Sequence, residues 1–229
     1  MSRRLWVLTA FTALLSSLLM AACGGGGDDT PLPTSYAARM AWAQLLSAQR
    51  AWTMTGAGPN AQAFTITLAF DPIPDGPFPV NGTTAKRTQE TVTVSSAGQT
   101  NTLMQTIYLD RTSLAFIGFD VDGACSVATS NAELPLNTLI GASGPVFSLS
   151  DLEGCTSGAI AAGTTSSTWS LEIDTGLALL CWNLISKDLV GVQNGSTSTC
   201  IEINANGSLG SRARFALTAL GVEIKARNF

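Results

Sequence analysis

The chain of 229 residues contains no histidine and few charged residues. Without histidine there is no serine–histidine or cysteine–histidine pair for nucleophilic catalysis. The sequence also lacks a Gly-x-Ser-x-Gly segment and a phosphate-binding loop, which excludes two further common kinds of enzyme site. We therefore expect a protein that is not an enzyme.

Charged residues make up 12% of the chain, and the basic ones are unevenly placed. No lysine or arginine occurs between Arg111 and Lys187, whereas seven carboxylates fall in that stretch. Such a chain has no broad basic face, so we expect no nucleic acid among its partners. The 45% share of hydrophobic residues is too high for a disordered chain and indicates a folded core.

The N-terminus combines positive charge with a short apolar run. Arg3 and Arg4 precede the mostly hydrophobic segment 5–19, and small residues then lead to Cys23. This order is typical of a secretory signal peptide. The run is shorter than the roughly 20 residues that a membrane-spanning helix needs.

The segment Leu19-Met20-Ala21-Ala22-Cys23 resembles the lipobox of bacterial lipoproteins, although Met20 stands where leucine is more usual. The resemblance implies cleavage before Cys23, a diacylglycerol on its thiol and an acyl chain such as palmitate on its amine. Because Gly24 rather than aspartate follows the cysteine, it also implies sorting to the outer membrane of a Gram-negative cell. Two or more acyl chains make a stable anchor in outer-membrane lipid. The alternatives are an ordinary cleaved signal and an inserted helix.

Three regions are predicted along the chain. Residues 1–22 form the signal peptide, and residues 23–34 form a tether. The tether begins with four flexible glycines and two aspartates and ends in a stiffer proline-containing stretch. Residues 35–229 are long enough for a single domain with a sizeable core.

Four cysteines remain beyond Cys23: Cys125, Cys155, Cys181 and Cys200. An even number in an exported chain indicates disulfides. Of the three possible pairings we favour Cys125–Cys155 and Cys181–Cys200, because sequential pairing suits a meandering sheet. The rival is a four-thiolate metal site. No Cys-x-x-Cys pair and no histidine are present, so we expect no metal and no cofactor besides the covalent lipid on Cys23.

One helix is predicted over residues 36–52. Pro33-Thr34-Ser35 supplies an N-cap signal, and good helix formers follow it. An apolar stripe with three- and four-residue steps runs along this segment and contains Tyr36, Met40, Trp42, Leu45, Leu46 and Gln49. We expect the stripe to pack against a sheet, with the clamping of a ligand or of an open sheet edge as the smaller possibility.

From Ala51 onward, hydrophobic residues alternate with polar ones, as in the run Phe64 to Phe70. Such alternation predicts half-buried strands. Strands are expected in segments 64–70, 91–95, 103–109, 115–121, 169–174, 177–184, 197–205, 210–217 and 222–228. The predicted fold is a mainly-β antiparallel meander, either a sandwich or an open barrel-like sheet, with one N-terminal helix packed on it.

Turn residues separate these strands. Asn81-Gly82, Asn194-Gly195 and Asn206-Gly207 are hairpin pairs, while segments 71–79 and 156–167 are predicted loops. For the last hairpin we predict a three-residue loop, 205–207. This loop places Ile203 opposite Leu209 and Thr199 opposite Ala213, and it brings Glu202 near Arg212.

Carboxylates are the remaining acid–base candidates. Glu172 and Asp174 share one strand face, as glycosidase carboxylates do, yet polar strand faces carry such residues routinely. We interpret them as a solvated face. Asp120-Val121-Asp122-Gly123 lacks the third oxygen ligand and the closing glutamate of a calcium loop, so it is interpreted as a turn.

The expected function is therefore non-catalytic. We expect a lipid-anchored module of the cell envelope that docks to an unknown protein partner or has a structural role. The alternative is a carrier that holds an apolar ligand in a β cup. Docking is preferred because the apolar positions suffice for a core and leave no clear surplus to line a cavity.

Overall fold

A computed structural model describes residues 32–58, 62–219 and 222–229. The predicted signal peptide of residues 1–22, Cys23 and most of the tether of residues 23–34 lie outside the described residues and stay predictions. The chain divides into two units, residues 1–32 and 33–229, and the second unit contains every described helix and strand. Within the described ranges, no helix has the length and apolar character needed to cross a membrane.

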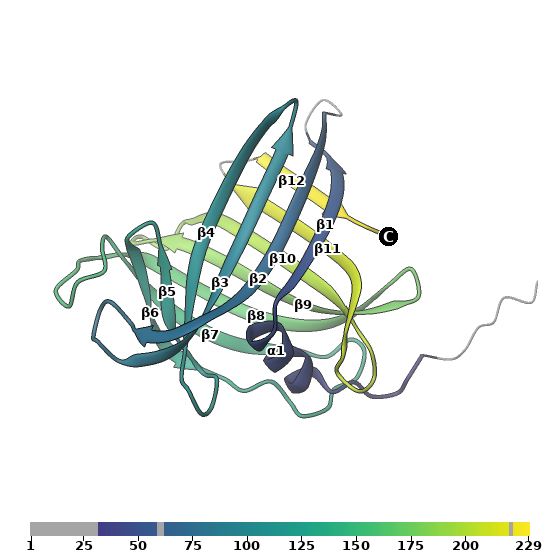
Figure 1. Cartoon of the computed structure of the whole chain (residues 1–229), viewed down its shortest axis with the longest axis horizontal. Helices are drawn as coiled ribbons and strands as arrows, with labels where there is room; N and C mark the ends of the chain where they lie inside the picture. The colour runs from purple at the N-terminus through teal and green to yellow at the C-terminus, as the bar shows by residue number, and fades with distance from the viewer. Residues whose placement is uncertain (1–31, 59–61, 220–221) are drawn as a thin grey trace, which may run out of the picture. The chain divides into compact units, whose positions relative to one another are not determined.

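The second unit is an antiparallel meander that closes on itself (Figure 1). Each strand pairs with the next along the chain, and the last pairs with the first. The elements are α1 (Ala38–Ser47), β1 (Arg50–Ala57), β2 (Ala63–Pro77), β3 (Thr84–Ser96), β4 (Gln99–Leu109), β5 (Phe116–Val121), β6 (Ala124–Asn131), β7 (Ser143–Leu152), β8 (Ala161–Asp174), β9 (Leu177–Asp188), β10 (Gln193–Ile203), β11 (Leu209–Ala219) and β12 (Val222–Arg227). The predicted mainly-β meander is confirmed, and it forms a closed barrel rather than a sandwich or an open sheet.

Closure depends on a short seam between β1 and β12. Two residue pairs form it, Thr55 with Arg227 and Gly56 with Ala226. In an open meander the first and last strands would each present unpaired backbone N–H and C=O groups at a sheet edge. The pairing of β1 with β12 removes both edges. Nothing in the periodicity of either strand indicates the pairing, because the two strands lie at opposite ends of the domain sequence.

The strands alternate between an apolar inner face and a polar outer face. Phe64, Ile66, Leu68 and Phe70 are buried inside, whereas the intervening threonines and alanine face outward. The same inner face continues around the barrel through Leu68, Val92 and Leu103, which lie opposite one another on β2, β3 and β4. The core therefore lies in the barrel interior, as the two-residue period predicts.

Helix α1 is shorter than predicted. It begins after Ala37, which makes no side-chain cap, and it ends at Ser47 because β1 already starts at Arg50. Its buried residues are Ala38, Ala41, Leu45 and Leu46, whereas Met40 is 54% exposed and Gln49 is exposed. Tyr36, Trp42, Leu45 and Leu46 of the predicted stripe do pack against the barrel core, as expected, and the two small alanines rather than Met40 and Gln49 complete the buried face.

Two predicted loops are partly strand. β2 runs on to Pro77 through the proline-rich segment, with a register shift between Ile73 and Gly76 that accommodates residues lacking an N–H donor. β8 begins at Ala161, inside the segment predicted to be loose. Strands β6 and β7 were not predicted, because serine and small residues weaken their alternation. No strand segment was predicted for β1 either, and the predicted helix extended into its start.

Two of the three predicted hairpin turns are confirmed. Gly82 and Gly207 adopt left-handed backbone conformations in hairpin turns, as predicted, and Asn204 N donates to Ser208 O across the expected three-residue loop. Ile203 lies opposite Leu209, and the Glu202 carboxylate accepts from Arg212 N at 3.1 Å.

Two details of the turns are wrong. A bulge shifts the register so that Ala213 lies opposite Ile201 rather than Thr199. Asn194-Gly195 is not a turn but the site of another bulge within β10, because the chain has already reversed at residues 189–191.

Candidate ligand-binding site

Helix α1 closes one end of the barrel, called the helix end below. Tyr36 N and Ala37 N donate to the carbonyls of Thr138 and Ala205, which lie in the β6–β7 and β10–β11 connections. The Thr88 hydroxyl on the inner wall donates to Leu46 O at 2.6 Å. These bonds fix both ends of α1, so its apolar residues project into the barrel.

Aromatic side chains pack densely above the helix. The Trp42 ring lies 5.8 Å from Trp182 and 6.0 Å from Phe116, and Phe70 lies 5.9 Å from Trp182, measured between ring centroids. The void among them has a volume of about 20 Å³. This is little more than one water molecule needs, so the helix end is a packed floor.

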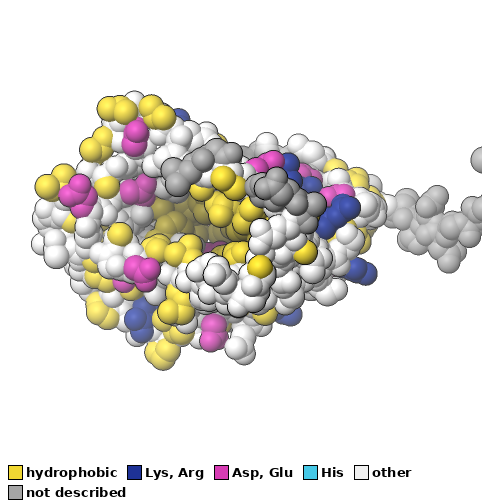
Figure 2. All heavy atoms as spheres, turned by 90° about the horizontal axis from the view of Figure 1, so that it is seen from above, with side chains coloured by type: hydrophobic (Ala, Val, Ile, Leu, Met, Phe, Trp, Pro, Cys, Tyr) yellow, Lys and Arg dark blue, Asp and Glu magenta, His cyan; other side chains and the backbone are white. Residues whose placement is uncertain are grey.

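The other end of the barrel, called the open end, contains a cavity of about 350 Å³. It lies within the range of about 300–1,000 Å³ that is common for small-molecule sites. Seen from above, Figure 2 shows a hollow whose wall is largely hydrophobic. The cavity is lined by Gln105, Phe119, Val121, Ser126, Thr165, Leu184, Ser186, Asn194, Gly195, Ser196, Thr197 and Leu217.

Several apolar side chains on the inner wall are left partly exposed. Leu103 shares the inner face with Val92 but is 50% exposed. Val92, Val94, Leu184, Leu217 and Ile224 are also only partly buried. The expectation that no apolar surplus remains is therefore wrong. A barrel of about eight strands can be filled by its own side chains, and a wider one leaves space.

A carboxyl group lies on the inner wall near the floor. Glu90 on β3 lies opposite Phe70 and Gln105 and is 8% exposed. The Gln105 amide donates to Glu90 Oε2. Burial raises the pKa of Glu90 from about 4.5 to about 7, and the hydrogen bond from Gln105 opposes part of this rise. Gln105 lines both the floor void and the open cavity.

A second polar group lies on the inner wall beside the open cavity. Asp151 on β7 accepts hydrogen bonds from Ser126 Oγ at 2.6 Å and from Thr165 Oγ1 at 2.8 Å, and Thr165 contacts Ser186 Oγ at 3.0 Å. Each carboxylate oxygen of Asp151 thus has a donor within the protein. The lining of the open cavity is mixed: Phe119, Val121, Leu184 and Leu217 are its apolar side chains, and uncharged polar side chains supply most of the rest.

The predicted carboxylate pair lies on the outer wall. Arg214 on β11 donates to Glu172 Oε2 at 2.7 Å and to Asp174 Oδ2 at 3.0 Å, while its Nη2 lies 3.3 Å from Cys200 Sγ. The cysteines of this cluster form the disulfide Cys181–Cys200 across paired residues of β9 and β10. The sequence analysis expected a solvated strand face for Glu172 and Asp174, and it did not predict their pairing with Arg214.

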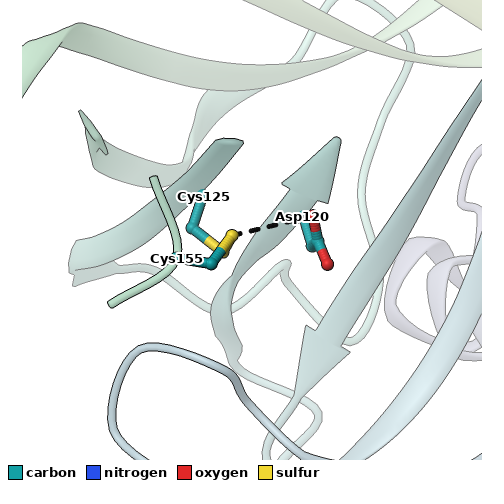
Figure 3. Close-up of side chains that lie close together, drawn as sticks. All are labelled: Asp120, Cys125 and Cys155. Atoms are coloured by element: carbon teal, nitrogen blue, oxygen red, sulfur yellow. Dashed lines mark hydrogen bonds between the residues drawn. A yellow bond between two sulfur atoms is a disulfide. The ribbon is translucent and has the colours of Figure 1, made fainter. Parts of the chain in front are cut away.

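The second disulfide, Cys125–Cys155, joins β6 to the β7–β8 connection. Figure 3 shows Asp120 directed at it, with Cys155 Sγ 3.7 Å from Asp120 Oδ1. A disulfide sulfur has no hydrogen to donate, so this contact becomes a hydrogen bond only on reduction. Asp120 Oδ1 also accepts from Gly123 N at 3.0 Å, which makes the segment a turn, as predicted.

The two disulfides have the pairing that the sequence analysis favoured. Among the described residues, two clusters bring potential metal ligands together: Asp120 with Cys125 and Cys155, and Glu172 with Cys181 and Cys200. Both clusters rely on disulfide sulfurs, which offer no thiolate while the bond is closed. Neither cluster is therefore a metal site in the oxidised protein.

A larger groove of about 570 Å³ lies on the outer wall near the seam. Its lining includes Arg214, Lys225 and Arg227. Arg214 is paired with two carboxylates, Lys225 Nζ lies 3.0 Å from Glu223 Oε2, and Arg227 covers the Phe229 ring. Because its cations are already engaged, this groove is a weaker candidate than the barrel interior.

Sequence reasoning missed the residues that make the interior distinctive. Glu90 lies in phase with Val92 and Val94 on the apolar side of its strand, and this conflict was the signal that could have singled it out. Leu103 was predicted to lie in a strand, but its exposure depends on the width of the barrel. No protein-family model, curated protein or solved structure matches the chain.

Proposed function

We propose that the protein is a carrier that holds a small apolar ligand inside its barrel. The proposal rests chiefly on the partly exposed apolar side chains of the inner wall, above all Leu184 and Leu217, which line the open cavity. Exposed apolar surface inside a concave wall gains free energy when an apolar ligand displaces water from it. The packed floor allows entry from the open end only.

The carrier is further proposed to be held at the outer membrane by the lipid on Cys23. This part rests on the lipobox and the glycine-rich tether of the sequence. A flexible tether keeps a carrier close to the membrane while allowing the mouth of the barrel to turn towards a donor or an acceptor of its ligand.

The test compares two adjacent positions on β9. Leu184 lines the open cavity, and Ile185, the next residue along the strand, is 36% exposed on the other face. A neutral fluorophore such as phenylnaphthylamine should bind the wild type saturably at one molecule per chain. Leu184→Lys should weaken this binding at least tenfold, because it places a charge in the cavity, whereas Ile185→Lys should not.

Absence of saturable binding to the wild type would overturn the proposal, as would equal effects of the two substitutions. Leu184 is only partly buried and Ile185 is exposed, so neither variant should lose its fold, and a thermal unfolding curve checks this. Mass spectrometry of lipid extracted from the native protein supplies a second measurement. A stoichiometric apolar molecule is expected there.

A docking module is the second candidate function. The turn between β9 and β10 at the open end presents Leu189, Val190 and Val192 to solvent, and Val190 is 83% exposed. Apolar side chains gathered on one turn are typical of a contact site. A photo-crosslinker at position 190 in intact cells should then yield one adduct of defined mass, and none should form from position 139 at the helix end.

A further inference from the structure

The buried carboxyl group of Glu90 is the feature of the interior that a purely apolar ligand leaves unexplained. At 8% exposure it is surrounded mainly by apolar side chains, and no cation lines the adjacent void among the described residues. Valine at this position would match Val92 and Val94 on the same face and would avoid the cost of burying a charge. A hydrogen-bond partner from the ligand would offset this cost.

At this point of the wall, hydrogen-bond acceptors outnumber donors. Above its raised pKa the Glu90 carboxylate is ionised and only accepts hydrogen bonds, so the Gln105 group that donates to it is the NH₂. The Gln105 carbonyl oxygen is then left for other partners, and Gln105 also lines the open cavity. Glu90 and Gln105 together offer more acceptors than donors to anything that reaches the floor.

Asp151 is the other carboxylate on the inner wall, and its situation differs. Ser126 and Thr165 already supply a donor to each of its oxygens. Among the described residues, Glu90 receives a donor at one oxygen only. The hydroxyls of Tyr36 and Ser167 are also buried without a partner there, but of the two inner-wall carboxylates Glu90 is the one with an oxygen left to accept a hydrogen bond.

We propose that Glu90 and Gln105 recognise the head group of an apolar ligand, and that this head group donates hydrogen bonds and carries no negative charge. An alcohol or an amine at the end of a hydrocarbon chain has this chemistry. A carboxylate head group would place a second negative charge beside Glu90 in a medium of low dielectric constant, which is unfavourable. This inference rests on the proposed carrier function.

The experiment measures displacement of phenylnaphthylamine by dodecanol, dodecylamine and dodecanoate, well above neutral pH so that Glu90 is ionised. The three probes share one chain and differ only in the head group. The wild type should bind the alcohol and the amine at least tenfold more tightly than the acid. In Glu90→Gln this difference in affinity between the acid and the other two probes should shrink to about threefold or less. The main reasons are that dodecanoate gains affinity and that dodecylamine loses it.

Gln89→Leu, on the outer face next to Glu90, is the matched control and should leave the order of the three probe affinities unchanged. Gln105→Leu is a second variant that should also weaken the preference for the alcohol. Equal affinities in the wild type, tighter binding of dodecanoate, or an unchanged order in Glu90→Gln would each overturn the inference. Failure of the carrier function itself is distinguishable, because the fluorophore would then not bind at all.

Discussion

Gly56 on β1 lies directly against the backbone carbonyl of Lys225 on β12. A Cβ atom at Gly56 would overlap that carbonyl oxygen and would come within 2.7 Å of the Phe64 ring. Closure of the barrel therefore requires a residue without a side chain at this point of the seam. The requirement is one of space, since the two strands meet at only two residue pairs.

Gly56→Ala should consequently destabilise the protein by about 1–3 kcal/mol, the usual cost of overpacking. The free energy of unfolding from urea titration measures this loss. Gly58→Ala is the control, because the nearest atoms to a Cβ there are 3.8 Å away. A midpoint for Gly56→Ala equal to that of Gly58→Ala would show that the seam does not depend on glycine.

Loss of either disulfide should lower stability without preventing the meander from forming. The two bonds span 30 and 19 residues, and in the chain-entropy model each contributes about 3–4 kcal/mol. Urea unfolding of the double variants Cys125→Ala/Cys155→Ala and Cys181→Ala/Cys200→Ala measures the two contributions separately. Mass mapping of unreduced protein should recover both pairs, and free thiols in periplasmic material would contradict the prediction.

The stability of the protein should fall as the pH rises from about 4.5 to about 7. Glu90 keeps its proton up to about pH 7 in the folded protein but loses it near pH 4.5 when unfolded. The unfolded chain thus binds fewer protons in this window, and the free energy of unfolding decreases with pH, by about 3 kcal/mol in total.

Glu90→Gln should remove this component of the pH dependence, which urea midpoints at several pH values would reveal. Glu133→Gln is the control, because the Glu133 side chain is 72% exposed and stays hydrated in the folded protein. An identical pH profile for Glu90→Gln and the wild type would mean that Glu90 is not held in a desolvated position.

Cys23→Ser tests the anchor that the lipobox implies. Without the thiol no diacylglycerol can be attached, so the protein should leave the membrane fraction or keep its signal peptide uncut. Fractionation of expressing cells followed by intact-mass measurement distinguishes these outcomes. A fully processed variant that still sediments with membranes would count against lipid attachment at this residue.

The local sequence determined most of the strands, though not β1, β6 or β7, and it also determined the hairpin at Asn206-Gly207 and the use of the cysteines. Alternation such as that from Phe64 to Phe70 specifies which side chains share a face, and it does so from neighbouring residues alone. The disulfide pairing follows from the same meander, since it brings Cys181 opposite Cys200. The sequence likewise predicted a solvated face for Glu172 and Asp174, because they alternate with apolar residues along one strand.

Only the tertiary structure decided that the sheet closes, and with it that a cavity exists. Closure depends on the fit of Gly56 against Lys225, two residues separated by most of the domain, and no periodicity reports such a contact. Once the barrel is closed, its width sets how much of Leu103 stays exposed, and the position of α1 sets which end is filled. The sequence makes Leu103 and Glu90 members of an inner face; the curvature of the whole sheet leaves Leu103 half exposed and buries Glu90.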